Sequence, residues 1–143
     1  MAGMWLVGED MPRETNRVSL SDRKDQFGMP VADVHFDDHE NDTTMRDHAY
    51  AQGRALYEAV GAVRTFPTPP YPSTHNLGTN RMSEKPADGV VNKFGQTHDI
   101  KNLFVSDGSQ FTTGGAENPT LTIVSLAIRQ AEYIAGEMKS RSI

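Results

Sequence analysis

The 143-residue sequence contains no cysteine, which excludes disulfides, cysteine-ligated zinc, iron–sulfur clusters and thiol nucleophiles. It also has no clustered excess of Lys and Arg, and its net charge is −5 at pH 7. Proteins that bind a phosphate backbone need such a cluster. No nucleic-acid partner is therefore expected.

Long apolar runs are absent as well. Residues 1–14 contain only a short apolar run, which has no basic residue before it and is followed at once by acidic residues. Signal peptides and membrane spans both need a longer apolar stretch. We expect neither in these residues, and the compartment, cytoplasmic or periplasmic, stays open.

What the sequence does contain is the composition of an ordinary globular protein, with 36% apolar and 23% charged residues. Its length is that of one domain, and no internal repeat or low-complexity tract interrupts it. The chain is therefore expected to fold around one core.

The first third of the sequence predicts a β-hairpin. Residues 16–20 and 31–36 alternate between apolar and polar side chains, which is typical of strands with one buried face. Residues 21–30, between them, are rich in turn formers.

A helical period follows over residues 44–60. Thr44 and Asp47 have the spacing of a capping box at the start, and Gly61 is a glycine stop. Residues spaced alternately four and three positions apart lie on one face of this helix: Met45, Ala49, Gln52, Leu56 and Ala59.

The second half begins with a loop over residues 62–89. Its prolines stiffen the approach to His75, and Gly78 frees the backbone beyond it. The prolines that frame the histidine are Pro67, Pro69, Pro70 and Pro72.

Two further strands are predicted, over residues 90–95 and 103–106, and then a long helix. Asn118 is its expected N-cap, and Pro119 is at the first helical position. Its apolar face is Leu121, Val124, Ile128, Ala131, Ile134 and Met138. Strands and helices in this order predict an α+β fold.

The start of the last helix is a candidate site. A helix N-terminus has unpaired N–H groups and about half a positive charge, which favours a group that is or becomes negative. Gly114 and Gly115 let backbone approach a ligand, and Asn118 has donor and acceptor groups. An ordinary helix cap explains the same residues without a ligand.

Two other features are compatible with chemistry. Asp107–Gly108 follows a predicted strand, where carboxylates commonly accept hydrogen bonds from ligand hydroxyls, although Asp and Gly are also ordinary turn residues. His75 on its loop is suited to proton transfer, although a lone histidine is usually a polar surface group.

The remaining histidines offer one alternative. Two of them lie in a stretch crowded with carboxylates, where a divalent-metal site is conceivable: His35, Asp37, Asp38, His39 and Asp42. A strand leading into a loop does not make these side chains converge, so no metal is assigned. His48 and His98 are interpreted as surface residues without partners.

Taken in order, the motifs of the second half resemble a known family. The form H-x-x-G-T (His75, Gly78, Thr79), then VVN, NLFVSDGS (102–109) and ENPTLTIVSLAIRQAEYIA (117–135) is similar to the C-terminal portion of the glucose–methanol–choline (GMC) oxidoreductases. NRVSLSDRKDQFGMPVADV resembles the family's strand-rich substrate domain. The resemblance runs from about residue 12 to the end.

The resemblance implies an FAD-dependent enzyme that oxidises a CH–OH group of an alcohol, sugar or polyol by hydride transfer to flavin. His75 is then the active-site base, and Asn118 is its catalytic partner beside the hydroxyl and the flavin. The implied cofactor-binding residues are Asp107, Gly108, Pro119 and Thr120. Residues 1–72 are implied to be a substrate-domain segment, and residues 73–143 to complete the FAD site with a strand and the long helix.

Two departures from the family pattern stand out. No G-x-G occurs, so the dinucleotide-binding unit that holds FAD is not in this sequence. The chain is therefore expected to be the C-terminal piece of a longer enzyme, which binds FAD tightly only with an N-terminal half. In addition, many relatives have T-C-R-M-G or T-A-x-M where this chain has TNRMS (79–83).

The expected partners follow from this interpretation. They are a small alcohol or sugar, the FAD-binding half, and an electron acceptor of unknown kind. Apolar faces that would contact the other half are expected to be exposed, so self-association is expected. The alternative is a non-catalytic module that completes a partner FAD-binding polypeptide.

Overall fold

The computed structural model describes residues 1–71 and 74–143. It contains a hairpin of β1 (Arg17–Lys24) and β2 (Pro30–His35), the helix α1 (Glu40–Ala59), the short 3₁₀ helix η1 (Gly108–Gln110) and the helix α2 (Thr120–Ser140). The predicted α+β class is confirmed. The predicted division of the chain between residues 72 and 73 lies outside the described residues.

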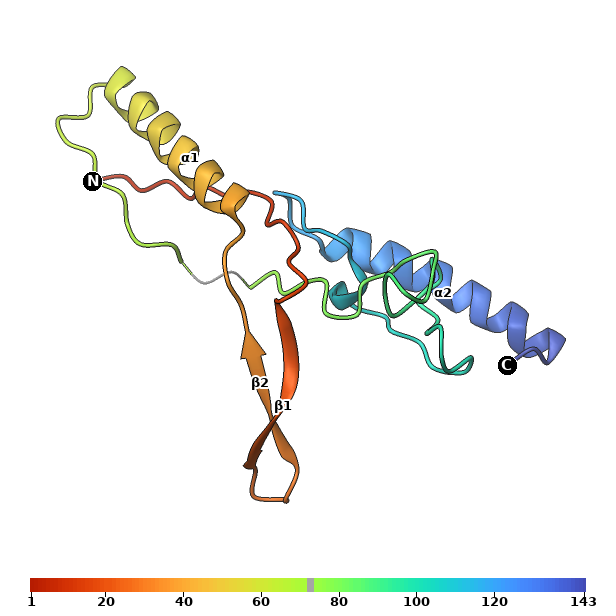
Figure 1. Cartoon of the computed structure of the whole chain (residues 1–143). Helices are drawn as coiled ribbons and strands as arrows, with labels where there is room; N and C mark the ends of the chain where they lie inside the picture. Colours follow the sequence, from red (N-terminus) through yellow and green to blue (C-terminus); the bar gives the residue numbers. More distant parts are fainter. Residues whose placement is uncertain (72–73) are drawn as a thin grey trace.

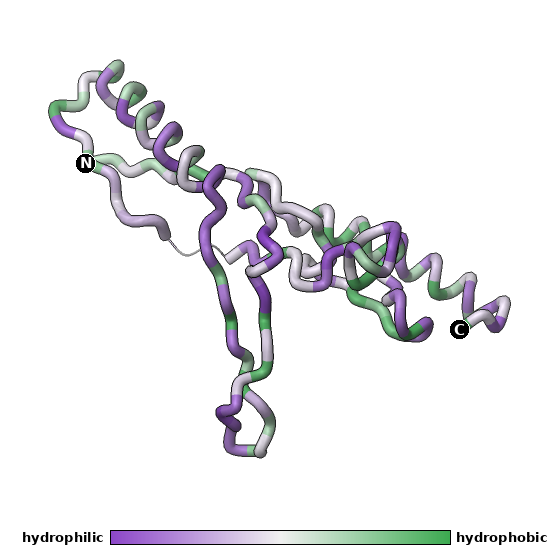
Figure 2. The backbone as a smooth tube through the Cα atoms, viewed as in Figure 1, coloured by the Kyte–Doolittle hydropathy of each residue, from purple (hydrophilic) through white to green (hydrophobic). Residues whose placement is uncertain are grey.

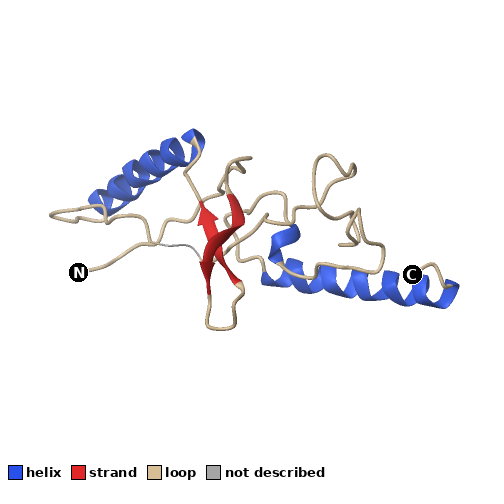
Figure 3. Ribbon diagram, turned by 60° about the horizontal axis from the view of Figure 1, so that its bottom comes forward, coloured by secondary structure: helices blue, strands red, loops and turns tan. Residues whose placement is uncertain are grey.

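The molecule is extended. Figure 1 shows α1 and α2 at opposite ends with the hairpin projecting between them, and Figure 3 shows the same separation after rotation. Among the described residues, Val91 is the one fully buried apolar side chain. The single core expected from the composition is therefore not formed by this chain alone.

The predicted hairpin is confirmed. β1 and β2 pair antiparallel, with Val18 opposite Val34 and Leu20 opposite Ala32, and the register shifts between Leu20 and Lys24. At the turn, the Asp25 carboxylate accepts hydrogen bonds from two backbone N–H groups, at 2.8 and 2.9 Å. A local carboxylate–backbone turn of this kind reverses the chain without help from the rest of the protein.

Helix α1 starts four residues earlier than predicted. The His39 side chain accepts a hydrogen bond from the N–H of Asn41 at 3.0 Å, and the Asp42 carboxylate accepts from the N–H of His39 at 2.9 Å. The capping box is therefore His39–Asp42 and not Thr44–Asp47. Thr44 lies inside the helix, one turn after Glu40, and its hydroxyl donates to the carbonyl of Glu40.

The predicted end of α1 at Gly61 is confirmed. Gly61 has φ of +87°, and its N–H donates to the carbonyl of Glu58. The next N–H, from Ala62, donates to the carbonyl of Tyr57. These two bonds form a Schellman motif, which needs a left-handed residue at this position and so favours glycine.

The first eleven residues lie along α1 and act as a strap. Leu6 lies near Gly53 of the helix, and Gly8 is packed tightly against Met45. The N–H of Met11 donates to the Asp42 carboxylate at 3.0 Å. Asp42 is only 5% exposed and also belongs to the capping box. Its carboxylate therefore joins the strap to the start of the helix.

One carboxyl group of the strap opposes this docking. Partial burial raises the pKa of Asp10 above its ordinary value of 3.8, and the carboxylates of Asp42 and Asp38 raise it further, while Arg46 lowers it. Since the pKa is raised in the docked state, the contribution of Asp10 to docking is most favourable below pH 3.8, its ordinary pKa value. It weakens as the pH rises through the raised pKa.

We expect Asp10→Asn to tighten the strap at neutral pH and to remove this pH dependence. Trp5, the one tryptophan, is in edge contact with Tyr71 at 5.1 Å, so its fluorescence reports the position of the strap. Glu9→Gln is the matched control, because it removes the neighbouring charge and should leave the pH dependence in place. The same titration in Asp10→Asn and in the unchanged chain would contradict the assignment.

The two strands predicted for the second half are wrong. Residues 90–95 and 103–106 take part in isolated bridges only: Val91 with Met82 and with Thr97, and Phe104 with Gln96. The physical reason is Asn92, whose side-chain oxygen accepts hydrogen bonds from the N–H groups of Phe94 and Gln96 and so turns the chain. Asparagine side chains commonly compete with ladder hydrogen bonds in this way.

Helix α2 holds this loop by polar and aromatic contacts. Gln130, only 5% exposed, donates to the carbonyls of Phe94 and Val105 at 3.0 and 2.8 Å. The Tyr133 ring stacks on Phe94 with centroids 4.1 Å apart, and its hydroxyl donates to Gln96. The loop of residues 91–105 and α2 therefore form one unit.

The apolar face predicted for α2 is present but exposed. Four of its members have large exposed fractions: Leu121 81%, Val124 49%, Ile128 59% and Met138 64%. Figure 2 shows apolar and polar stretches alternating along both helices. This observation agrees with the prediction that the chain exposes apolar faces, and self-association remains a prediction. Neither helix of the described residues is long and apolar enough to cross a bilayer.

Candidate functional site

The turn at η1 is built by Asp107. Its side chain accepts hydrogen bonds from the N–H and the hydroxyl of Ser109, at 2.8 and 2.5 Å. These bonds, first the side-chain bond and then the backbone bond, lower the pKa of Asp107 below its ordinary value. Asp107 is exposed at the surface, while Gly108 next to it is buried.

Leu77 brings the histidine loop to this turn. The Leu77 side chain packs against both Gly108 and Gly114. A Cβ added at Gly108 would lie 2.6 Å from one methyl carbon of Leu77, and a Cβ added at Gly114 would lie 2.7 Å from the other. The backbone bonds of Asn80 to Ser109 and of Met82 to Gln110, at 2.9 and 2.8 Å, add to this contact. The loop that follows His75 is therefore fixed against η1.

A pocket of about 140 Å³ lies where these segments meet the start of α2. Asn118 and Pro119 line it, and Leu77 lines the same pocket from the histidine loop. Its remaining lining residues are Phe111, Thr113, Gly114, Gly115, Glu117 and Thr122. His75, which is half-buried, lies two residues before Leu77 and is not among the lining residues.

The structure thus brings together part of the predicted site. Asn118 and Pro119 share a pocket with the histidine loop, and Gly108 contacts that loop through Leu77. Asp107 and Thr120 are neighbours of these residues in the chain but do not line the pocket.

The predicted cap of α2 is wrong. The helix begins at Thr120 with Pro119 as its N-cap, and no side chain accepts a hydrogen bond there. The exposed Asn118 therefore does not cap the helix. Because no side chain satisfies them, the N–H groups of the first turn are left to solvent or to a ligand.

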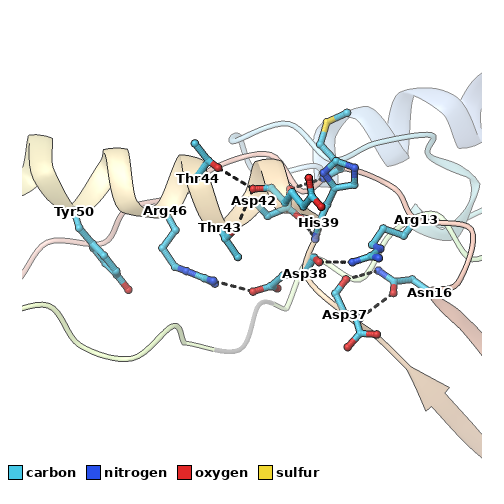
Figure 4. A network of polar contacts seen from close by, with 12 residues as sticks. Arg13, Asn16, Asp37, Asp38, His39, Asp42, Thr43, Thr44, Arg46 and Tyr50 are labelled. Atoms are coloured by element: carbon cyan, nitrogen blue, oxygen red, sulfur yellow. Dashed lines mark hydrogen bonds and ion pairs between the residues drawn. The ribbon is translucent and has the colours of Figure 1, made fainter.

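The carboxylates near α1 are used in local structure. Figure 4 shows Arg46 paired with Asp38, at 2.9 Å, and Asn16 bonded to the backbone of Asp37. His35 pairs with Asp37 at 3.2 Å, and His39 caps α1. Within residues 1–71 and 74–143, no three His, Asp or Glu side chains are grouped to hold a metal ion.

A larger open hollow, of about 380 Å³, lies beside this network. It contains none of the predicted site residues, and its histidine is already the cap of α1. It is lined by Pro12, Arg13, Glu14, Thr15, His39 and Glu40.

The interpretation of His98 as a residue without a partner is wrong. Its Nε2 lies 3.2 Å from the hydroxyl of Ser83, which itself donates to the carbonyl of Lys85. Because that hydroxyl hydrogen is already used, His98 must donate to Ser83 and is not placed to activate it. His48 is exposed on α1 as expected.

Sequence reasoning missed Leu77, Asn80 and Ser109, which make the site's internal contacts. Leu77 and Ser109 lie inside the quoted motifs, but nothing in their spacing indicates that they meet. One indication that Asn80 is unusual was present in the sequence, because this chain departs there from the pattern of the family it resembles.

Comparison with known proteins agrees with this arrangement. A family model described as GMC oxidoreductase matches residues 12–127, which include the hairpin, α1, η1 and the first part of α2. The chain belongs to the GMC oxidoreductases. The predicted membership in this family, in its C-terminal part, is confirmed.

Several GMC relatives are similar over nearly the whole chain. They include 2-methyl-1,2-propanediol dehydrogenase of Mycolicibacterium austroafricanum, with 46% identity over 92% of this chain and 25% of the relative. The fructose dehydrogenase large subunit of Gluconobacter japonicus has 34% identity over 92% of this chain and 24% of the relative. The C-glycoside 3-oxidase of Arthrobacter globiformis has 36% identity over 98% of this chain and 28% of the relative.

The chain spans about a quarter of the length of these relatives. GMC membership implies FAD, and the residues present are compatible with one side of a flavin site. The first turn of α2 has no side-chain cap, and a Cβ at Gly115 would meet nothing closer than the N–H of Glu117 at 4.0 Å. A group that gains negative charge is favoured at such a helix end.

Proposed function

We propose that this chain supplies the catalytic side of an FAD-dependent GMC enzyme that oxidises a CH–OH group of an alcohol, sugar or polyol. Support comes from the family match and from relatives whose names include alcohol and sugar dehydrogenases and oxidases. The single observation that carries the proposal is the pocket that joins the histidine loop, through Leu77, to Asn118 at the start of α2.

In this proposal, FAD supplies the acceptor for the hydride that leaves the substrate carbon. His75 accepts the proton of the substrate hydroxyl, and Asn118 orients that hydroxyl through its amide. The uncapped first turn of α2, preceded by Pro119 and begun by Thr120, stabilises negative charge that arrives beside it. The donors are already in place, so little reorganisation accompanies the reaction.

The residues at the start of η1 have a separate role in this proposal. The Asp107 carboxylate would accept hydrogen bonds from hydroxyl groups of the cofactor's ribityl chain, and Gly108 allows close packing of the turn. Ionised Asp107 is the better acceptor, and the bonds from Ser109 that lower its pKa favour the ionised form.

A mixing experiment tests this function. We expect the chain alone to retain no flavin after gel filtration, because the dinucleotide-binding fingerprint is not in its sequence. Mixed with the part of the Mycolicibacterium relative that this chain does not match, it should retain FAD and support dye reduction by an alcohol or sugar. Stoichiometric flavin on the chain alone would contradict the division of the cofactor site. Flavin retention without dye reduction would contradict the catalytic role.

A second candidate is a non-catalytic assembly module, and the exposed apolar face of α2 favours it. In that case the chain would complete the partner's fold while the partner carried all chemistry. The same mixture separates the two functions, because an assembly module should keep its effect when His75 is replaced.

A further inference from the structure

Asn80 connects the loop that follows His75 to the turn that carries Asp107. Its backbone N–H donates to the carbonyl of Ser109 at 2.9 Å. Its side-chain Nδ2 donates to the hydroxyl of Ser109 at 3.1 Å. Both contacts join segments 29 residues apart, and both side chains are half-buried.

The hydroxyl of Ser109 continues the connection in one direction. A serine hydroxyl has one hydrogen, and the 2.5 Å contact with Oδ1 of Asp107 uses it. The nitrogen of Asn80 can only donate, so Ser109 must accept from it. The chain of donors therefore runs from Asn80 through Ser109 to Asp107, and each bond polarises the next.

This series of hydrogen bonds ends at the exposed carboxylate of Asp107, of which one oxygen accepts hydrogen bonds. The bonds from the N–H and the hydroxyl of Ser109 both end on Oδ1. They restrict the orientation of the Asp107 carboxylate, and no hydrogen bond from another described residue ends on Oδ2. A ligand that presents hydroxyl groups is the natural partner for an oriented, ionised carboxylate.

We propose that Asn80 is a positioning residue that acts through Ser109 to orient the Asp107 carboxylate toward a hydroxyl-bearing ligand. The identity of that ligand, the polyol chain of the cofactor, rests on the function proposed above. The connection itself rests on the hydrogen bonds alone. Asn80 thereby ties the turn that receives the cofactor to the loop that carries the catalytic base.

A purely structural role for Asn80 makes a different prediction. In Asn80→Ala the backbone bond to Ser109 remains, as does the bond between Met82 and Gln110. The two segments should therefore stay together, and only the donor to the Ser109 hydroxyl is lost. A structural staple would change the stability of the chain without changing the ionisation of Asp107.

The test is a double-mutant cycle read by the pKa of Asp107, measured by NMR titration of its side-chain carboxyl in the whole chain. Asn80→Ala should raise this pKa, because the Ser109 hydroxyl loses the contact that holds its orientation. Ser109→Ala should raise it further by removing the hydroxyl bond. The double variant should match Ser109→Ala, since Asn80 then has nothing to act through.

Controls keep this result interpretable. Asn102→Ala changes an exposed asparagine of the neighbouring segment and should leave the pKa of Asp107 in place. If Asn80→Ala does not fold, Asn80→Asp preserves the shape, cannot donate to Ser109 and should also raise the pKa, with Asn102→Asp as the control for added charge. An unchanged pKa in Asn80→Ala, or an equal rise in the Ser109→Ala background, would overturn the proposal.

Flavin retention separates this inference from the proposed function. In the two-part assembly, Asn80→Ala should weaken FAD binding by about two- to tenfold. A change of this size is expected when one hydrogen bond to the Asp107 carboxylate is weakened because the carboxylate is no longer well oriented. If the pKa cycle behaves as expected and FAD binding is unchanged, the coupling stands and the cofactor role of Asp107 is overturned. If the cycle fails while FAD binds and turnover occurs, the positioning role is overturned and the enzymatic function stands.

Discussion

Replacement of His75 by alanine is expected to lower kcat/KM by a factor of about one hundred or more in the flavin-loaded assembly. The reason is that the substrate hydroxyl then has no side chain to receive its proton as the hydride leaves. FAD content should be unchanged, because the proposed role of His75 is toward the substrate hydroxyl and not toward the cofactor. Steady-state dye reduction and the flavin absorbance of the same sample measure both quantities.

His75→Gln and His48→Ala complete this experiment. Glutamine preserves hydrogen-bonding groups but cannot accept the proton, so it should be nearly as impaired as alanine. His48 is exposed on α1, far along the chain from the pocket, and its replacement should leave turnover unchanged. If His75→Ala turns over at the normal rate, His75 is not the base and the catalytic assignment is lost.

The largest effect on stability is expected from Gly95→Ala. Gly95 has φ of +70°, and a Cβ there would lie 2.5 Å from the carbonyl oxygen of Val105 and still closer to the amide of Gln130. The substitution therefore combines left-handed strain with displacement of a buried hydrogen-bonding side chain. We expect a loss of about 3 kcal/mol or more, measured by hydrogen exchange of the N–H groups of Thr97 and Val105.

Gly28→Ala is the matched control for backbone strain. Gly28 has φ of +80°, but no other atom lies within 4 Å of a Cβ built there. Only the strain of a left-handed alanine should appear, about 1 kcal/mol, and it should be confined to the hairpin. Equal losses at the two glycines would show that Gln130 does not hold the loop against α2.

Local signals predicted much of the fold because they act through the backbone of nearby residues. The turn after β1 and the stop at Gly61 follow from turn formers and from left-handed glycine, and the structure has both. The start of α1 was missed because His39 is an unusual cap, whose ring nitrogen replaces the usual hydroxyl or carboxylate. The strand predicted at residues 90–95 failed because the side chain of Asn92 bonds to the backbone ahead of it.

The sequence proposes members of a site but does not predict the contacts between them. The family resemblance identifies His75 and Asn118 by motif, but no spacing indicates that Leu77 fills the space at Gly108 and Gly114. Such contacts depend on how segments thirty or more residues apart pack, which a sequence pattern does not encode. The exposure of the apolar face of α2 likewise follows from the absence of a packing partner among the described residues and not from its own sequence.

The central claim is that the His75 imidazole and the Asn118 amide act on one substrate hydroxyl. An experimental structure of the flavin-loaded assembly with a bound alcohol, or an unreactive analogue, tests it most directly. We expect both side chains within about 2.6–3.2 Å of the same hydroxyl oxygen, in the pocket at the start of α2. An alcohol held by other residues, with the two side chains on separate surfaces, would contradict the claim.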